Sequence, residues 1–141
     1  MVTGVCTEYC FDETGSKIIY YGNGKVALFY CTDRKTNIEV MKSEATWIYT
    51  IVKMIHDIDK QQINFLVDLH NTHAVQVNKE LMEFYHEIMQ AGMSNIKKVS
   101  VVGDVFQCSV LRILSTSIPK YQNNIHFFLN YKKAKMWLKW I

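Results

Sequence analysis

The alternation of apolar and polar positions near the N-terminus predicts a hairpin. Two runs rich in β-forming residues, Lys17–Tyr21 and Lys25–Cys31, flank Gly22, Asn23 and Gly24. These three residues accept the positive φ angles of a tight turn, so the runs should pair as antiparallel strands. Residues 1–16 show few periodic apolar positions, and we assign them to an N-terminal arm without a defined element.

After the hairpin, apolar residues recur at spacings of three and four, which is typical of amphipathic helices. The first such segment runs from Ser43 to about Asp59, although Thr36–Glu39 also has the spacing of a capping box and could start the helix earlier. Its expected buried stripe is Trp47, Ile48, Ile51, Val52, Ile55 and Ile58.

Three more helices follow by the same criterion. Asn78 should cap a second helix that ends at Gly92, and Val105–Ile118 should form a third that Pro119 terminates. Asn130 should cap a last helix, Tyr131–Ile141. The expected buried face of the second helix is Leu81, Phe84, Tyr85, Ile88 and Ala91.

Between these helices lie short apolar runs that suit strands covered on both faces. Ile63–Leu69 and Lys97–Gly103 are nearly unbroken, and Ile125–Leu129 is a shorter third run. The order is therefore β-β-α-β-α-β-α-β-α, which predicts an α/β fold: a mixed sheet that begins with a hairpin and continues with αβ units, with helices packed on the sheet. We expect residues 17–141 to form one domain.

Composition narrows the function classes. The net charge of +3 is too small and scattered to indicate nucleic-acid binding, and charged residues interrupt every apolar stretch before it reaches the length of a membrane span. No secretion signal is visible at the N-terminus, so we expect a cytoplasmic protein with its four cysteines reduced. No signature of a cofactor site is present.

Three segments resemble the STAS superfamily, most closely its small stand-alone branch, called SpoIIAA-like or STAS/SEC14-like. They are Phe65–Leu69 with the loop and helix that follow, Lys98–Asp104, and the closing segment Phe128–Leu138, which carries an Ala-x-x-Trp-Leu pattern. The resemblance extends from Lys17 to the end of the chain. It implies a STAS-like α/β domain that acts as a regulatory or protein-interaction module.

The resemblance also implies a phosphorylation switch, which this chain does not support. Anti-sigma-factor antagonists of the superfamily carry a phosphorylatable Ser at the N-terminus of the helix after the central strand. The matching stretch here, Ala74–Asn78, contains no Ser, Thr or Gly. Asn78 can cap the helix, but it cannot accept a phosphate.

The most chemically suggestive cluster follows the central strand. Asp68, His70 and His73 leave the carboxyl end of Ile63–Leu69, and Asp104 leaves the neighbouring strand in the same way. Ligands usually bind at this edge of an open α/β sheet, so these residues and Asn78 are candidates for a ligand or partner loop. Imidazole and carboxylate groups also suit zinc or iron. The alternative is a solvated loop in which Asp68 caps backbone amides.

Other residues offer less specific chemistry. Cys108 falls near the start of the third predicted helix, where a helix dipole could lower a thiol pKa, but a small buried core residue is the simpler interpretation. Trp140 lies off the apolar stripe of the last helix, which predicts an exposed aromatic side chain and a contact in a homodimer.

Three functional hypotheses follow. The preferred one is a non-enzymatic, STAS-like regulatory or interaction domain that binds a protein partner. The alternative is a carrier that holds a lipid or other small apolar ligand between sheet and helices, with Phe84, Tyr85, Phe106 and the methionines as lining. A third is a metal-assisted enzyme using Asp68, His70, His73 and Asp104. A large apolar cavity would favour the carrier, and a solid core with an exposed apolar patch would favour the interaction domain.

Overall fold

The computed structural model describes residues 6–32, 37–72, 79–116 and 123–140. Six strands form one mixed sheet in the order β1-β2-β3-β4-β5-β6. The strands are β1 (Thr7–Phe11), β2 (Ser16–Gly22), β3 (Lys25–Cys31), β4 (Ile63–Asn71), β5 (Ile96–Val102) and β6 (Ile125–Phe128). Pairing is antiparallel from β1 to β3 and parallel from β3 to β6. The α/β fold expected from the sequence is confirmed.

The N-terminal hairpin forms as predicted. Asn23 and Gly24 both have positive φ, 51° and 72°, which suits the two-residue turn that joins β2 to β3. Within residues 1–16, which the sequence pattern left without an element, the structure adds strand β1, antiparallel to β2 at the sheet edge. Its side chains are mostly exposed, which explains why it carries no clear apolar period.

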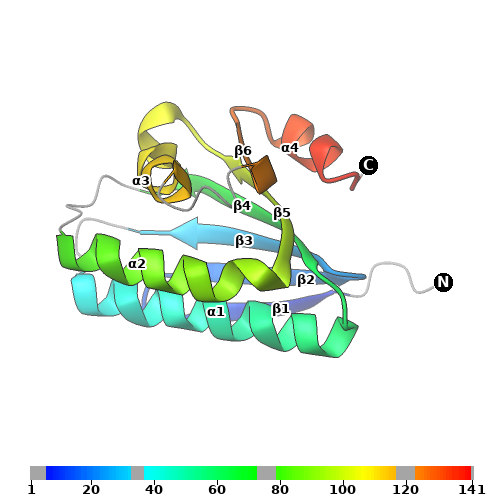
Figure 1. The fold of residues 1–141 in the computed structure, drawn as a ribbon, viewed down its shortest axis with the longest axis horizontal. Coiled ribbons are helices and arrows are strands. Elements are labelled where there is room, and N and C mark those ends of the chain that lie inside the picture. The colour runs from blue at the N-terminus through cyan, green and yellow to red at the C-terminus, as the bar shows by residue number, and fades with distance from the viewer. Residues whose placement is uncertain (1–5, 33–36, 73–78, 117–122, 141) are drawn as a thin grey trace.

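The helices cover the two faces of the sheet unequally. They are α1 (Ile38–Asp59), α2 (Lys79–Gly92), α3 (Val105–Thr116) and α4 (Tyr131–Trp137), and a 3-10 turn, η1 (Met93–Asn95), follows α2. The crossovers α1, α2 and α3 connect parallel strands that are neighbours in order, so crossovers of one hand place all three on the same face. Helices α1 and α2 lie side by side in Figure 1, and α3 lies farther along the width of the sheet, toward β6.

Two apolar clusters reflect this arrangement. The larger one joins alternate residues of the strands, such as Leu28, Val67 and Val101, to the helices α1 to α3. The intervening residues Ala27, Leu66 and Val102 point to the opposite face and pack with Ala134 and Leu138 at α4. The two-residue period of the strands thus assigns each side chain to one helical layer.

The start of the first helix and parts of two predicted stripes differ from expectation. Helix α1 starts at Ile38, because Asn37 caps it by accepting a hydrogen bond from the Val40 amide at 2.9 Å. The start at Ser43 was therefore wrong, and the helix begins within Thr36–Glu39, the earlier segment that the sequence left open. Ile58 and Ala91 were expected to be buried, but both are exposed, since each lies in the last turn of its helix, beyond the apolar partners. The expected end of α3, at Ile118 and Pro119, lies outside the described residues.

The C-terminal helix is shorter than predicted, and its end repositions Trp140. Helix α4 ends at Trp137, and Lys139 adopts φ 62°. The Lys139 and Trp140 amides donate to the Met136 and Lys135 carbonyls, both at 2.9 Å, which is the Schellman pattern that reverses a chain. The turn brings the Trp140 ring edge-on to Tyr21, with 5.8 Å between ring centroids. The prediction of an exposed Trp140 was therefore wrong.

None of the helices within the described ranges is both long enough and apolar enough to cross a membrane.

Candidate functional site

A cavity of about 680 Å³ lies between the sheet and the helices α1, α2 and α3. Strands β3, β4 and β5 supply its floor, with Leu28, Val67 and Val101 among the lining residues. The walls come from one side of each helix, including Ala45 of α1 and Leu111 of α3. This volume lies in the range of small-molecule sites in proteins, and most of the lining is apolar, as in such sites.

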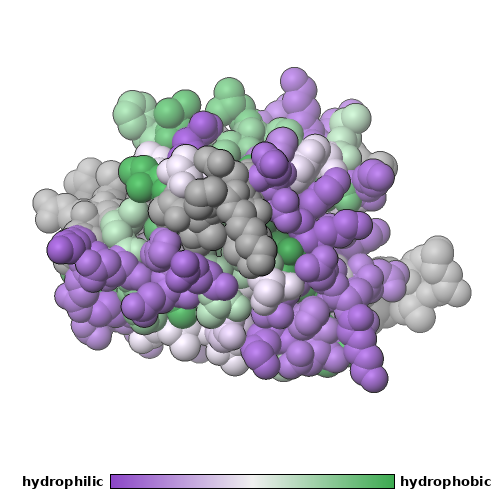
Figure 2. All heavy atoms as spheres, in the orientation of Figure 1, coloured by the Kyte–Doolittle hydropathy of each residue, from purple (hydrophilic) through white to green (hydrophobic). Residues whose placement is uncertain are grey.

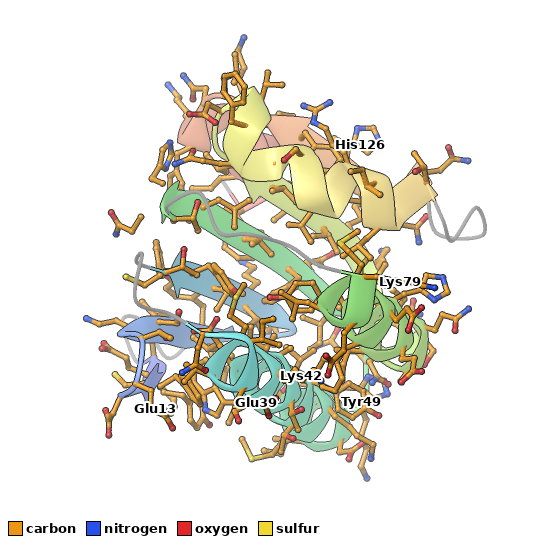
Figure 3. The ribbon with its side chains drawn as sticks, turned by 90° about the vertical axis from the view of Figure 1, so that its left-hand side faces the viewer. Glu13, Glu39, Lys42, Tyr49, Lys79 and His126 are labelled. Atoms are coloured by element: carbon orange, nitrogen blue, oxygen red, sulfur yellow. The ribbon has the colours of Figure 1, made fainter. Side chains whose placement is uncertain are left out.

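The lining agrees largely with the carrier hypothesis. Tyr85, Phe106 and three methionines contribute to the cavity wall, the methionines being Met41, Met89 and Met93. Phe84 does not line the cavity, because its ring turns toward Lys42, whose Nζ lies 5.6 Å from the ring centroid. Figure 3 shows Lys42 between α1 and α2.

Hydroxyl groups gather at the end of the cavity where the parallel strands terminate. Tyr30 lies at the end of β3 and Tyr85 on α2, and their hydroxyl oxygens are 3.4 Å apart. Thr72 follows β4 on the same edge and also lines the cavity. Burial raises the pKa of both tyrosines, so both phenols are neutral near pH 7. This edge of the sheet is where open α/β folds bind ligands.

A buried carboxyl group stands behind the Tyr30 hydroxyl. Glu44 of α1 is fully inaccessible to solvent, and its Oε2 accepts hydrogen bonds from the hydroxyls of Thr14 and Ser16, the latter at 2.8 Å. Its Oε1 has no hydrogen-bond partner among the described residues. Burial raises the Glu44 pKa, and the neighbouring hydroxyl groups of Thr14, Ser16 and Tyr30 oppose that rise without cancelling it.

Asp68 and His70, two of the candidate residues, lie in the last part of β4 and form a local pair on the other face of the sheet. Asp68 Oδ1 accepts a hydrogen bond from the His70 backbone amide at 2.9 Å and lies 2.7 Å from His70 Nδ1. The Asp68 side chain is also among the charges that raise the Tyr131 pKa, after the dominant effect of burial. Asp68 therefore caps backbone as in the solvated-loop interpretation and lies on the α4 side, away from the cavity.

Asp104 has a structural task at the start of α3. Its Oδ1 accepts from the Gln107 amide at 2.7 Å, and Gln107 Oε1 accepts from the Asp104 amide at 2.9 Å. This reciprocal pair is a capping box. Gln107 Nε2 also donates to the His70 carbonyl at 3.2 Å, which ties α3 to the end of β4. Both Asp104 and Gln107 line the cavity.

No group of three or more potential metal ligands occurs within the described ranges. His73 and Asn78, the two remaining candidates, lie outside the described residues. Cys108 is buried, and burial raises its thiol pKa, in agreement with the core interpretation. Of the four candidate metal ligands, the described structure thus brings only Asp68 and His70 together. Asp104 lies on the opposite side of the sheet from this pair.

Apolar side chains also reach the surface around α3, as Figure 2 shows at the top of the molecule. Phe106 is 88% exposed and Leu129 is 75% exposed, and Val105 and Ile113 are exposed as well. The Gly103 amide donates to the Phe128 carbonyl at 3.2 Å, which holds the start of α3 next to the end of β6. We call Val105, Phe106, Ile113 and Leu129 the α3 patch.

Sequence reasoning missed Glu44 and the Tyr30 hydroxyl. Glu44 belongs to the buried face of α1, next to Ala45. The sequence pattern began this buried face only at Trp47 and so left Glu44 out. A charged residue in line with Met41 and Ile48 was the available signal, because a carboxylate on an apolar stripe is rarely without a partner.

Comparisons with known proteins bear on the fold. No protein-family model matches the chain, and no curated protein matches it. Among solved structures, the NMR structure of the protein TM1081 is similar, with a TM-score of 0.52 and 13% sequence identity, over 99% of this chain and 98% of that one. At this identity the likeness extends to the fold alone.

Proposed function

We propose that this chain is a non-enzymatic, STAS-like domain that binds a small apolar molecule between its sheet and its helices α1 to α3. The single observation that carries the proposal is the cavity of about 680 Å³ with a mainly apolar lining. It favours the carrier hypothesis over a solid interaction module. STAS affiliation and a cytoplasmic location remain part of the proposal, supported by the sequence pattern.

The test is native mass spectrometry of the full-length, untagged protein, followed by titration with an apolar fluorescent probe. We expect an adduct of small-molecule mass, or saturable binding of the probe at a stoichiometry of one. Val101→Phe places a larger side chain in the cavity floor and should weaken probe binding at least about tenfold. Ile58→Phe changes an exposed position on α1 and serves as the control. Equal binding by both variants would refute a site in this cavity.

The α3 patch supports a second candidate, a protein-interaction surface. Exposed apolar patches on small domains commonly mark contact sites, and this one lies at the strand edge where the sequence analysis expected a partner. We propose self-association through this patch as the simplest form. Sedimentation velocity over a range of concentrations should show a dimer in the parent protein.

Leu129→Ser should shift the protein toward monomer, because it removes a patch residue that does not line the cavity. Ile58→Ser removes an exposed apolar residue of similar exposure elsewhere and should leave the dimer intact. A parent protein that stays monomeric at all concentrations, or equal behaviour of the two variants, would remove this candidate.

A further inference from the structure

The chemistry of the cavity lining restricts the head group of the ligand. Of the lining residues that the structure describes, Asp104 is the one acidic residue, and no Lys, Arg or His is among them. An anionic head group would therefore find no neutralising cation among these described residues. Burying an unpaired charge in an apolar site is strongly unfavourable, so the described lining favours an uncharged head group over a carboxylate or a phosphate.

The polar groups at the strand edge add a positive preference. The Tyr30 and Tyr85 hydroxyl oxygens lie 3.4 Å apart, and both residues line the cavity. A phenol hydroxyl carries one donor hydrogen and also accepts hydrogen bonds. A ligand hydroxyl placed beside Tyr85 can therefore accept a hydrogen bond from a phenol and donate one to it.

The apolar part of the lining defines the rest of the ligand. Away from the strand edge, the cavity is bounded by Val52, Phe65, Met93, Val99 and Ile125, all of them apolar and most of them deeply buried. Tyr49 and Asn95 are the polar exceptions at this end among the described lining residues. A hydrocarbon body fits such a wall because it removes apolar surface from water on both sides.

We propose, on the basis of the proposed binding function, that the cavity takes a neutral amphiphile of the alcohol class, with its hydroxyl at the Tyr30 and Tyr85 end and its hydrocarbon body toward Met93 and Ile125. The lack of a cation among the described lining residues, the adjoining phenols and the apolar depth all support this class. Fatty acids and phospholipids share the body but carry an anionic head, so they should bind this described lining more weakly.

The test compares two probes with one body and different heads, 1-decanol and decanoate, at about pH 8, where decanoate is ionised. Binding is measured by displacement of an apolar fluorescent probe from the full-length protein. Decanol should displace the probe, and decanoate should bind at least about tenfold more weakly. Decanoate binding as tightly as decanol would overturn the inference while leaving the proposed function intact. Failure of both to bind, with no binding of the fluorescent probe itself, would instead overturn the proposed function.

A matched pair of variants locates the head group. Tyr85→Phe removes the hydroxyl that faces Tyr30 and should weaken decanol binding about three- to tenfold, the range for one lost hydrogen bond. Tyr21→Phe removes a hydroxyl near Trp140, on the other face of the sheet, and should leave binding unchanged. Unchanged decanol binding in Tyr85→Phe would contradict the proposed position of the head group. Circular dichroism checks that both variants fold.

Discussion

The same substitution on the two faces of the sheet should change stability in opposite directions. Ala45 lies on α1 and lines the cavity, whereas Ala134 lies on α4 and is fully buried against Leu66 and Val102. Both are helical alanines, and leucine has nearly the helix propensity of alanine. Replacing each with leucine therefore isolates the space available around the side chain.

The expected magnitudes follow from that space. Ala45→Leu adds three carbons that can enter the cavity, and at about 0.8 kcal/mol for each buried carbon the gain reaches at most about 2.4 kcal/mol. Ala134→Leu must force α4 away from β5, whose Ser100 hydroxyl donates a hydrogen bond to the Ala134 carbonyl at 3.0 Å. Overpacking of this kind costs about 1–3 kcal/mol. The two variants should differ in unfolding free energy by several kcal/mol.

Urea unfolding followed by circular dichroism measures both free energies, and unchanged m-values would show that the comparison is sound. A stabilised Ala45→Leu beside a destabilised Ala134→Leu would establish open space on the helical side. Loss of stability in both variants, by similar amounts, would refute the reasoning, because it would mean that α1 packs as tightly on the sheet as α4 does.

Three further predictions concern titration and reactivity. Because the folded pKa of Glu44 is raised, its contribution to stability is fully present below the pKa of the unfolded chain and is lost as pH rises through the folded value. The Glu44→Gln variant should therefore gain stability relative to the parent protein as pH increases. A difference in urea unfolding free energy that does not change with pH would contradict this prediction. Burial and then Asp59 raise the Tyr20 pKa to about 12, so Asp59→Asn should lower it, as ultraviolet titration of phenolate would show. A thiol reagent should modify the exposed Cys6 in the native protein and Cys108 only after unfolding, and equal rates would disprove the buried location.

The sequence pattern predicted the central strands well because their environment is uniform. Residues of β4 and β5 are covered on both faces, so an unbroken apolar run identifies them without knowledge of their neighbours. Strand β1 escaped prediction for the opposite reason, since one partner strand and an exposed surface leave no apolar period. The end of α4 depended on a backbone reversal at Lys139, a residue type with no preference for positive φ.

The site was harder to predict than the fold because it is assembled from different elements. Asp68, His70 and Asp104 all lie near the carboxyl ends of the neighbouring strands β4 and β5. The pleat of β4 nevertheless directs Asp68 to the α4 face of the sheet, and Asp104 caps the start of α3. The Tyr30, Glu44 and Tyr85 cluster joins β3, α1 and α2, and no spacing along the chain connects them. Local patterns find strands and caps, but only the tertiary structure brings these three side chains together.

A cavity of this size is itself an argument for an occupant. In enclosed cores where its cost has been measured, empty apolar volume destabilises by about 24 cal/mol for each Å³. A space of about 680 Å³ that is partly open to solvent costs less for each Å³, but it leaves the same apolar wall against water. Water fills such a space poorly when most of the wall cannot form hydrogen bonds with it. A bound apolar molecule would remove this wall from water and would therefore stabilise the folded chain, by an amount that grows as its concentration rises above its Kd.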